Sequence, residues 1–451
     1  MVKQKKTVEE LFEEALVPKD EQPYKVPKNW VWTNLKSLFE INMGQSPKGE
    51  FTTDDSSYTP LIGGPADMGK DFPKVSRYTK KATKLSSEDD LIISIRATIG
   101  KTNIADGQYC LGRGVAGIKS GKIETKLLRF YIETIQSYLS KISTGTTFKQ
   151  ISKKNIEDIS FPLPPLSEQK RIVEKIERLL SKIDEAKQLI EEAKDSFEPR
   201  RNAILDKAFR GEFNGQEIDL KELDGMNYFI PSNWNWMSLE DVCELISDCP
   251  HSTPKYIEDG QYPAIRTSDV HFGKIDISKA RRVSEKDYLE RTRNTQPQKG
   301  DIIYCREGTI GNAGIIEDEI VCLAQRVVLF RPNKVKALPK YFVYLLNSPI
   351  MLRQVFSNIS QTTSPRINIS TLRKLRLPIA PIEIQQNIVN IIEKNLEIEQ
   401  RANNLCKLEG NLDALRQSIL SKAFQGELGT NNPSEESSVE LLKEVLQEQV
   451  Q

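Results

Sequence analysis

Two patterns of apolar and polar residues alternate along this chain. In residues 26–166 and 230–382, short apolar runs are separated by glycine, proline, serine, threonine and aspartate; residues 91–95 and 115–118 are two such runs. Short apolar runs bounded by turn-forming residues are typical of strands. We therefore predict a β-rich domain in each region, with a few helices, one of them near residues 126–140.

The second pattern occupies residues 167–213 and 383–428, where apolar residues form a seam along one helix face, in the first segment at alternating spacings of four and three. In the first segment they are Ile172, Ile176, Leu179, Ile183, Ala186, Ile190, Ala193 and Phe197. In the second they include Ile384, Ile388, Ile392, Leu405, Leu408, Leu412, Leu415 and Ile419. A heptad seam of this kind predicts a coiled-coil helix, and two such helices in one chain pack most economically antiparallel. We expect Ser167 to cap the first helix, Pro199 to kink or break it, and polar residues 395–404 to interrupt the second seam.

The second half of the chain repeats the first. Residues 26–32 (VPKNWVW) return as 230–236 (IPSNWNW), 163–170 (LPPLSEQK) as 379–386 (IAPIEIQQ), and 204–212 (ILDKAFRGE) as 419–427 (ILSKAFQGE). The repeat unit is therefore as large as a domain and is not a solenoid repeat. Because the copies diverge between these anchors, we expect one scaffold that carries two different recognition surfaces.

These patterns predict an α+β fold with a pseudo-twofold internal repeat, in which two mixed α/β domains are joined by two long antiparallel coiled-coil helices. Short amphipathic helices are also expected at residues 7–17 and 439–450. The predicted segments are an N-terminal extension (1–25), a first domain (26–166), a first spacer helix (167–213), a linker (214–229), a second domain (230–382), a second spacer helix (383–428) and a polar C-terminal tail (429–451).

The composition limits the kinds of partner that the chain can bind. Lys and Arg total 64 against 63 Asp and Glu, so the formal net charge is +1 and the chain is not a polycation that coats nucleic acid. Any nucleic-acid binding must come from local basic patches. No apolar stretch approaches the ~18 residues that span a bilayer, and the lysine-rich start leads into glutamates, so we expect a cytoplasmic protein without membrane contact. The six cysteines are scattered; reduced thiols are a better interpretation than zinc at Cys249 and His251.

The sequence offers little for catalysis. Residues 64–70 fit the first seven positions of the phosphate-binding loop G-x-x-x-x-G-K-[ST], but Asp71 replaces the hydroxyl residue that holds magnesium. With only two histidines, His251 and His271, a Ser/His/Asp or Cys/His mechanism lacks its components. We interpret the chain as a binding protein without catalytic residues or a metal site. A nucleotide-dependent enzyme that uses the Gly64 loop is one alternative.

Basic residues gather in the divergent regions. The first domain has a run without acidic residues that contains Lys74, Arg77, Lys80, Lys81 and Lys84, and Arg96 lies just beyond the expected strand at 91–95. The second domain has basic residues in similar places: Arg281, Arg282, Arg291 and Arg293, with Arg306 after residues 302–304. Lysine and arginine supply phosphate contacts, and arginine also reaches base edges. On charge alone, an ordinary solvated surface is the better interpretation.

The order of the repeated motifs favours DNA binding over an ordinary solvated surface. They are the Asn-Trp-x-Trp segments at Asn29 and Asn233, Thr-Ile-Gly at 98–100 and 309–311, the segment 162–173 with a looser copy from Pro378, and the Ala-Phe-x-Gly-Glu endings at Ala208 and Ala423. Each is weak alone, but the ordered set, present twice, closely resembles a type I restriction-modification specificity (S) subunit over nearly the whole chain. The second copy departs from the motif at residues 380–384, and the extension and the tail carry none of these motifs.

The resemblance implies a non-catalytic DNA-recognition subunit. Each domain would read one half of an asymmetric, bipartite target in double-stranded DNA, and the helices would act as spacer and dock two methyltransferase subunits. Motor-nuclease restriction subunits would complete the complex. The methyl donor, ATP and magnesium are expected on those partners, with no cofactor in this chain. A coiled-coil adaptor without DNA affinity is the other alternative.

Within the two domains, loops that combine small hydroxyl residues with a long cation or amide suit base edges and phosphates together. In the first domain the candidate DNA contacts are Gln45, Ser46, Lys48, Thr146, Thr147, Lys149 and Gln150, together with Arg77, Lys80, Lys81 and Arg96. In the second they are His251, Ser252, Thr253, Lys255, Thr362, Thr363 and Arg366, together with Arg281, Arg282 and Arg306.

Overall fold

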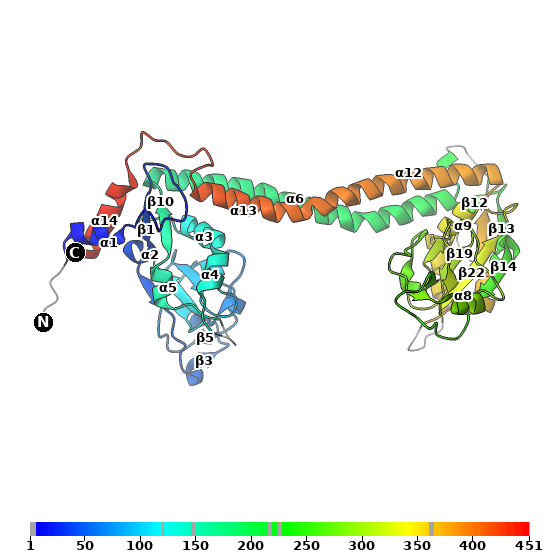
Figure 1. Ribbon diagram of the computed structural model, residues 1–451, viewed down its shortest axis with the longest axis horizontal. Coiled ribbons are helices and arrows are strands. Elements are labelled where there is room, and N and C mark those ends of the chain that lie inside the picture. The colour runs from blue at the N-terminus through cyan, green and yellow to red at the C-terminus, as the bar shows by residue number, and fades with distance from the viewer. Residues whose placement is uncertain are drawn as a thin grey trace. The chain divides into compact units, whose positions relative to one another are not determined.

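The computed structural model describes residues 6–119, 121–145, 149–214, 219–222, 228–359 and 365–450. The chain forms two compact units (Figure 1). Unit 1 consists of residues 1–189 together with 408–451, and unit 2 consists of residues 190–407. Each unit contains a mixed α/β domain and segments of the long helices, so the predicted α+β class is confirmed.

The core of unit 1 is a four-stranded antiparallel sheet. Its strands, in spatial order, are β2 (Ile41–Met43), β9 (Val115–Ile118), β6 (Leu91–Ser94) and β7 (Thr102–Ile104). A second sheet has the order β3 (Thr52–Thr53), β5 (Tyr78–Thr79), β4 (Thr59–Ile62) and β8 (Cys110–Leu111), with β4 and β8 parallel. The remaining elements of the domain are α2 (Leu35–Leu38), α3 (Thr125–Thr134), α4 (Gln136–Ile142), α5 (Lys153–Glu157), and the antiparallel pair β1 (Val31–Asn34) and β10 (Ser160–Leu163).

Unit 2 repeats this topology, as the sequence predicts. Its main sheet has the order β14 (Cys243–Asp248), β22 (Val327–Pro332), β19 (Ile302–Cys305) and β20 (Ala313–Ile315). Beside it lies the sheet β18 (Arg282–Val283), β15 (Tyr262–Ile265) and β21 (Cys322–Leu323), again with one parallel pair. The other elements are β11 (Leu220–Glu222), β12 (Phe229–Pro231), β13 (Asn235–Ser238), β16 (Val270–His271), β17 (Lys274–Ile275), β23 (Arg376–Ile379), α7 (Leu239–Val242), α8 (Glu285–Arg291), α9 (Pro339–Leu346), α10 (Pro349–Ser357) and α11 (Ile369–Lys374).

The first long helix, α6 (Leu166–Phe209), differs from the prediction at two points. It begins before Ser167, because the Pro165 carbonyl already accepts the Glu168 N–H at 3.0 Å, so Ser167 lies in the first turn and is not the cap. The helix also continues through Pro199 without a break. A proline removes only one backbone donor, and in unit 2 the following turns are fixed by packing of buried side chains such as Leu205.

The second long helix is not continuous. It consists of α12 (Ile382–Cys406), the 3₁₀ turn η5 (Lys407–Glu409) and α13 (Gly410–Phe424). The interruption therefore comes later than the polar stretch 395–404, next to a glycine that disfavours the helix. A 3₁₀ turn has three residues per turn, so it rotates the apolar seam. As a result Leu405, Leu408 and Leu415 are exposed, and this part of the predicted seam is wrong.

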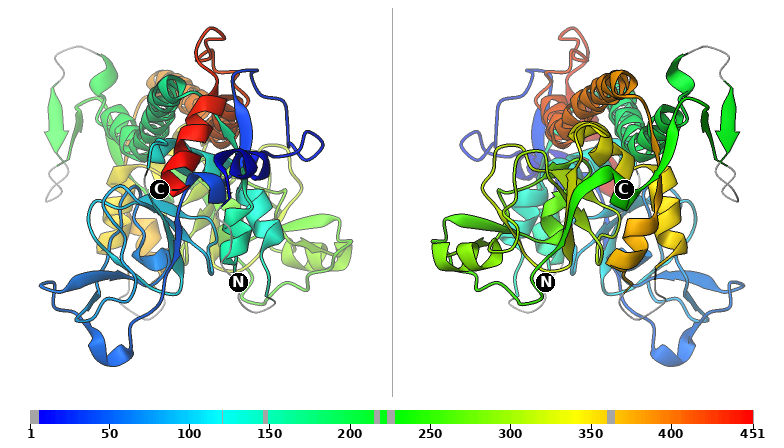
Figure 2. Two further views of the ribbon diagram at one scale, coloured as in Figure 1. Left: turned by 90° about the vertical axis from the view of Figure 1, so that its left-hand side faces the viewer. Right: turned by 90° about the vertical axis from the view of Figure 1, so that its right-hand side faces the viewer.

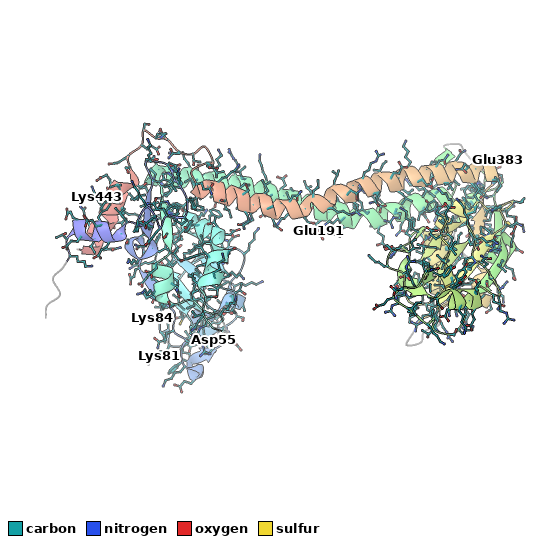
Figure 3. All side chains as sticks on the ribbon, in the orientation of Figure 1. Asp55, Lys81, Lys84, Glu191, Glu383 and Lys443 are labelled. Carbon is teal, nitrogen blue, oxygen red and sulfur yellow. The ribbon has the colours of Figure 1, made fainter. Side chains whose placement is uncertain are left out.

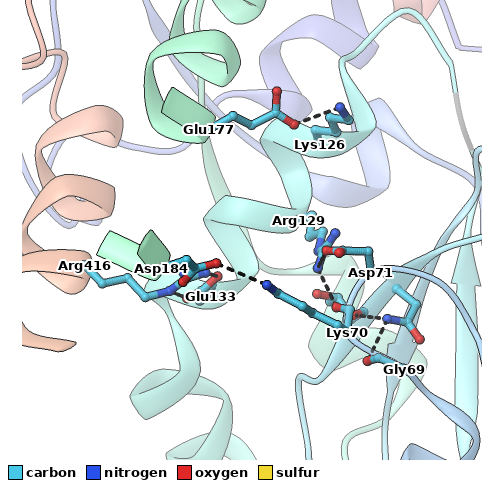
Figure 4. A network of polar contacts seen from close by, with 11 residues as sticks. Gly69, Lys70, Asp71, Lys126, Arg129, Glu133, Glu177, Asp184 and Arg416 are labelled. Atoms are coloured by element: carbon cyan, nitrogen blue, oxygen red, sulfur yellow. Dashed lines mark hydrogen bonds and ion pairs between the residues drawn. The ribbon is translucent and has the colours of Figure 1, made fainter. Parts of the chain in front are cut away.

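In unit 1, α13 lies along the first part of α6 (Figure 1). Their common core contains Ile172, Ile176, Leu180, Ile183, Ile419, Leu420, Ala423 and Phe424. Ion pairs connect this helix pair to the domain below it (Figure 4). Lys126 pairs with Glu177 of α6 at 2.8 Å, and Lys70 pairs with Asp184 at 3.1 Å. Arg129 holds the same loop through Asp71 at 2.8 Å. In this arrangement Lys70, the lysine that the phosphate-binding alternative needs, faces a carboxylate of α6 in an exposed ion pair.

The predicted terminal helices are confirmed, and they pack on each other in unit 1. α1 (Val8–Ala15) begins at a Thr7 capping box, and α14 (Ser438–Val450) lies beside it (Figure 2). Leu441, Leu442, Val445 and Leu446 enter the unit 1 core, against which Val8, Leu11 and Phe12 also pack. The C-terminal segment is therefore part of unit 1.

A buried carboxylate fixes this segment. Glu168 is fully buried and accepts hydrogen bonds from Trp30 Nε1 (2.7 Å), Thr430 Oγ1 (3.1 Å) and Asn431 Nδ2 (2.9 Å). The repeat places Ile384 at the position of Glu168 in unit 2. Within the described part of the chain, the indole N–H of Trp234, the counterpart of Trp30, is buried without a partner. The two units therefore differ in how their entry segments are held.

Candidate nucleic-acid interface

In both units, turns that follow equivalent strands meet at one end of the sheets. In unit 1 this strand-end surface consists of residues 44–48, 63–67, 95–99, 112–114 and 149–150. Ile95 N–H donates to Gly114 O at 2.9 Å, and an isolated bridge joins Arg96 to Gln150. In unit 2 the strand-end surface consists of residues 249–255, 266–269, 305–309, 324–326 and 365–367.

The same bonds recur in unit 2. Arg306 N–H donates to Arg326 O at 3.2 Å, and a bridge joins Glu307 to Arg366. The structural counterpart of Arg96 is therefore Glu307, and Arg306 corresponds to Ile95. The expectation that Arg96 and Arg306 occupy similar places is wrong, because the turns after β6 and β19 (residues 95–101 and 306–312) are equally long, and Arg306 is the first residue of its turn whereas Arg96 is the second.

Hydroxyl and amide groups line the surface in unit 1. Gln45 and Ser46 are exposed, and Ser46 Oγ accepts the Arg113 N–H at 3.1 Å, which brings the exposed Arg113 beside them. Arg96, Lys149 and Gln150 are also exposed. Side chains that can read base edges thus gather at one place.

Lysines border this surface. Lys48, Lys80, Lys81 and Lys84 are exposed; Lys80 lies over the Tyr58 ring and Lys81 over the Phe51 ring, each 5.6 Å from the ring centre. Figure 3 shows Lys81 and Lys84 on the side of unit 1 away from α6. Arg77 is different, because it pairs with the buried Asp67 at 3.1 Å and keeps about half of its side chain exposed.

In unit 2 the loop after β14 carries the polar groups. His251, Ser252, Thr253 and Lys255 are exposed. Gln325 Nε2 donates to the His251 carbonyl at 2.7 Å, and Arg291 donates to the Ser252 carbonyl at 3.2 Å. These two contacts fix the loop against the strand ends.

The four predicted arginines of unit 2 have different environments. Arg281 is exposed and lies 5.2 Å over the Tyr256 ring, and Arg282 is exposed and donates to the Gln261 carbonyl at 2.9 Å. Arg306 has a side chain that is only 12% exposed, 3.5 Å from Asp248 and 3.9 Å from Glu307. The Arg306 side chain is thus largely buried under the turn. Among the predicted arginines of unit 2, it is therefore the least accessible to DNA. Arg366 is exposed.

Thr146, Thr147, Thr362 and Thr363 lie outside the described residues. Three residues of the strand-end surfaces, Arg113, Gln325 and Arg326, are missing from the sequence-based candidates. Aligning Leu111-Gly112-Arg113-Gly114-Val115 with Leu323-Ala324-Gln325-Arg326-Val327 would have found them, because both pentapeptides lead into the central strand of the main sheet.

The titratable groups give no sign of a nucleophile. All six cysteines are free thiols, and five of them are buried. Burial raises the pKa of the Cys305 and Cys322 thiols to about 11, so neither is a thiolate at neutral pH. The described residues contain no cluster of histidine, cysteine or acidic side chains with the geometry of a metal site. Nor do they include a helix of the length and apolar character needed to cross a membrane.

The chain is therefore a repeated scaffold whose equivalent strand-end surfaces carry different polar side chains. The chain matches the family model described as "Type I restriction modification DNA specificity domain" twice, over residues 27–195 and 231–407. The chain belongs to this family of DNA specificity domains.

Individual relatives agree with this assignment. The chain is 30% identical over 315 residues to the type I restriction enzyme EcoBI specificity subunit of Escherichia coli, in a match that covers 66% of this chain and 65% of that protein. It is 36% identical to the putative MjaX specificity subunit of Methanocaldococcus jannaschii, of which it covers 37%. It is 25% identical to the EcoKI specificity subunit of E. coli K12, with 90% of each chain covered.

The fold is also that of a solved structure. The HsdS subunit from Thermoanaerobacter tengcongensis superimposes with a TM-score of 0.61 at 19% identity, over 90% of this chain and 100% of that one. A chain from a study of complex assembly and conformational transition in the type I R-M system gives a TM-score of 0.64 at 21% identity, with the same coverage.

Proposed function

We propose that this chain is the DNA-recognition subunit of a type I restriction-modification complex, and that the strand-end surface of each unit reads one half of a bipartite target. One observation carries the proposal: equivalent positions on one scaffold hold different side chains. Arg96 in unit 1 corresponds to Glu307 in unit 2, and Gly114 corresponds to Arg326. Two surfaces that differ in charge and shape select different bases, so the target is asymmetric.

The surroundings of the strand-end surfaces suit a nucleic-acid backbone. Exposed lysines and arginines border the polar groups in both units, Lys81 and Arg281 among them. Cations of this kind position a protein on phosphates, while the enclosed amide and hydroxyl groups reach base edges. The near-zero net charge of the chain restricts this attraction to the bordered surfaces.

The long helices would dock two methyltransferase subunits. Apolar side chains are exposed on them: Leu189, Leu408 and Leu415 in unit 1, and Ile398 and Leu405 in unit 2. Exposed apolar side chains on a helix favour a protein partner. The internal repeat provides one docking region for each copy of the partner, and restriction subunits would join the complex through the methyltransferase. Methyl transfer and DNA cleavage, with the methyl donor, ATP and magnesium, are proposed to reside on those partners.

A methylation experiment tests the proposal. The chain is expressed with its methyltransferase partner in a host without adenine methylation, and the modified sites are mapped by sequencing. We expect one motif with two different half-sites and an unread gap. Replacing residues 26–166 with another recognition domain should change one half-site and leave the other intact. A change in both halves would contradict independent reading.

The alternative of an adaptor without DNA affinity predicts a different result. The assembled complex should bind duplex DNA with an affinity that falls steeply as salt rises, because phosphate contacts release counterions. An adaptor complex would show neither binding nor salt dependence. Methylation of DNA by the purified chain alone would contradict its non-catalytic role.

A further inference from the structure

On the proposed function, in which unit 2 reads one half-site, we infer that Arg326 reads a guanine of that half-site and that Glu307 positions the arginine for this contact. Arg326 ends the turn that leads into β22, the buried strand next to β19 in the main sheet. Its side chain is 61% exposed on the strand-end surface.

The backbone of Arg326 supports a functional role. Its φ is +68°, in the left-handed region that residues with a Cβ rarely adopt. Such conformations collect at functional sites, where the surrounding structure holds them. Here the Arg326 carbonyl accepts the Arg306 N–H at 3.2 Å, and the preceding residue, Gln325, is clamped to the His251 carbonyl at 2.7 Å. The turn therefore fixes the direction in which the side chain leaves the sheet.

The guanidinium is oriented as well. Arg326 Nε lies 3.3 Å from a carboxylate oxygen of Glu307, whose side chain is only 16% exposed and is itself 3.9 Å from Arg306. No other carboxylate within the described ranges pairs with Arg326. An arginine held through Nε presents its two terminal nitrogens as a fork. This fork matches the O6 and N7 acceptors of guanine in the major groove.

The neighbouring carboxylate favours a base over a phosphate. A phosphate within reach of the Arg326 fork would also approach Glu307, and the two negative groups would repel each other. The guanine edge is neutral, so it gains both hydrogen bonds without that repulsion. The arginines that do not share a carboxylate, such as Arg281, are better suited to phosphates.

Unit 1 has nothing equivalent. Its counterpart of Arg326 is Gly114, where a Cβ atom would stand 2.3 Å from the Gly63 carbonyl oxygen. A side chain has no room at that position, so the contact belongs to unit 2 alone. Loss of Arg326 should therefore alter one position in one half-site.

The test uses the chain assembled with its methyltransferase subunits and a library of DNA duplexes randomised over both half-sites. The variants are Arg326→Gly, Arg326→Lys and Glu307→Gln, with Arg281→Ala as the matched control. Methylated duplexes are sequenced, and a chain with residues 26–166 exchanged identifies the half-site of unit 2. Glycine accepts the left-handed backbone, so the Arg326→Gly chain should melt no lower than the wild type.

We expect the wild-type complex to require guanine at one position of that half-site. Arg326→Gly and Arg326→Lys should reduce this preference roughly ten- to hundred-fold, since each good bidentate pair discriminates by about that factor. Glu307→Gln should reduce it less, and Arg281→Ala should weaken methylation of all sequences alike.

Three results would overturn the role of Arg326: an unchanged motif in both arginine variants, lost preference for a base pair other than guanine–cytosine, or a uniform loss like that of the control. A wild-type complex that methylates without any motif would instead overturn the proposed function itself, and the two failures are thereby distinguished.

Discussion

Replacing Glu168 with isoleucine gives unit 1 the residue that unit 2 carries at the equivalent position, Ile384. The substitution removes the acceptor shared by Trp30, Thr430 and Asn431. Trp30 and Thr430 are 5% and 9% exposed, so water does not easily replace the lost oxygen atoms. Asn431 is half-buried and can turn to solvent.

The cost follows from the two buried donors. An unsatisfied buried donor costs about 1–3 kcal/mol. The change also removes the desolvation cost of a buried carboxylate, which offsets part of this loss. We expect a net loss of about 2 kcal/mol in the free energy of unfolding of unit 1, or roughly 4–8 °C in its melting temperature for a unit of this size.

Calorimetry of the full chain measures this, since we expect each compact unit to give its own unfolding transition. The Glu168→Ile chain should lower the transition of unit 1 and leave that of unit 2 in place, and it should speed protease cleavage within residues 429–437. Glu168→Gln keeps one acceptor oxygen and is the matched control, with a smaller shift. Equal melting and equal cleavage in Glu168→Ile and wild type would refute the role given to this carboxylate.

Three further perturbations have defined outcomes. Ala97 has a φ of +60°, so Ala97→Gly should stabilise unit 1 by about 0.5–1 kcal/mol, measured by thermal unfolding, and a lower melting temperature would contradict the assigned strain. Four residues inserted into each long helix beside the Arg201–Glu399 ion pair add about 6 Å of helix, so the unread gap should grow by one or two base pairs in methylation mapping. An unchanged gap would mean that the helices are not the spacer. The hydrogen bond from Arg171 lowers the pKa of Glu435 from its ordinary value of 4.5. The stability that this ion pair contributes is complete above that value and is lost as pH falls through the lowered pKa. Protease sensitivity of residues 429–437 should therefore rise only in acid.

Local patterns in the sequence were sufficient for much of the architecture. The apolar runs at 91–95 and 115–118 form β6 and β9. They could be predicted because an apolar run bounded by turn residues is a local feature of the sequence. The repeat predicted the common topology of the two units, since equivalent strands pair in the same order. The helix at 126–140 was found, although it is divided into α3 and α4.

Several of the failures come from contact between residues far apart in sequence. Nothing in the sequence near Glu168 indicates that Thr430 and Asn431, two of its three hydrogen-bond partners, lie more than 250 residues away. The exposure of Leu408 depends on the 3₁₀ turn η5 in which it lies, and the burial of Arg306 depends on Asp248. The loops chosen as candidate sites were reasonable by composition, but the importance of Arg326 rests on a backbone conformation that composition does not reveal.

The division of the chain into its units has a consequence for synthesis on the ribosome. Unit 2 is built from one continuous stretch, residues 190–407, and can close as soon as that stretch has emerged. Unit 1 needs residues 408–451 as well, and the core of its first domain includes Phe424 and Leu442. The domain made first is thus completed last, and until then its apolar surface is open to chaperones and proteases. A chain that ends before residue 408 would keep this apolar surface exposed, and we expect it to be degraded before it joins a complex.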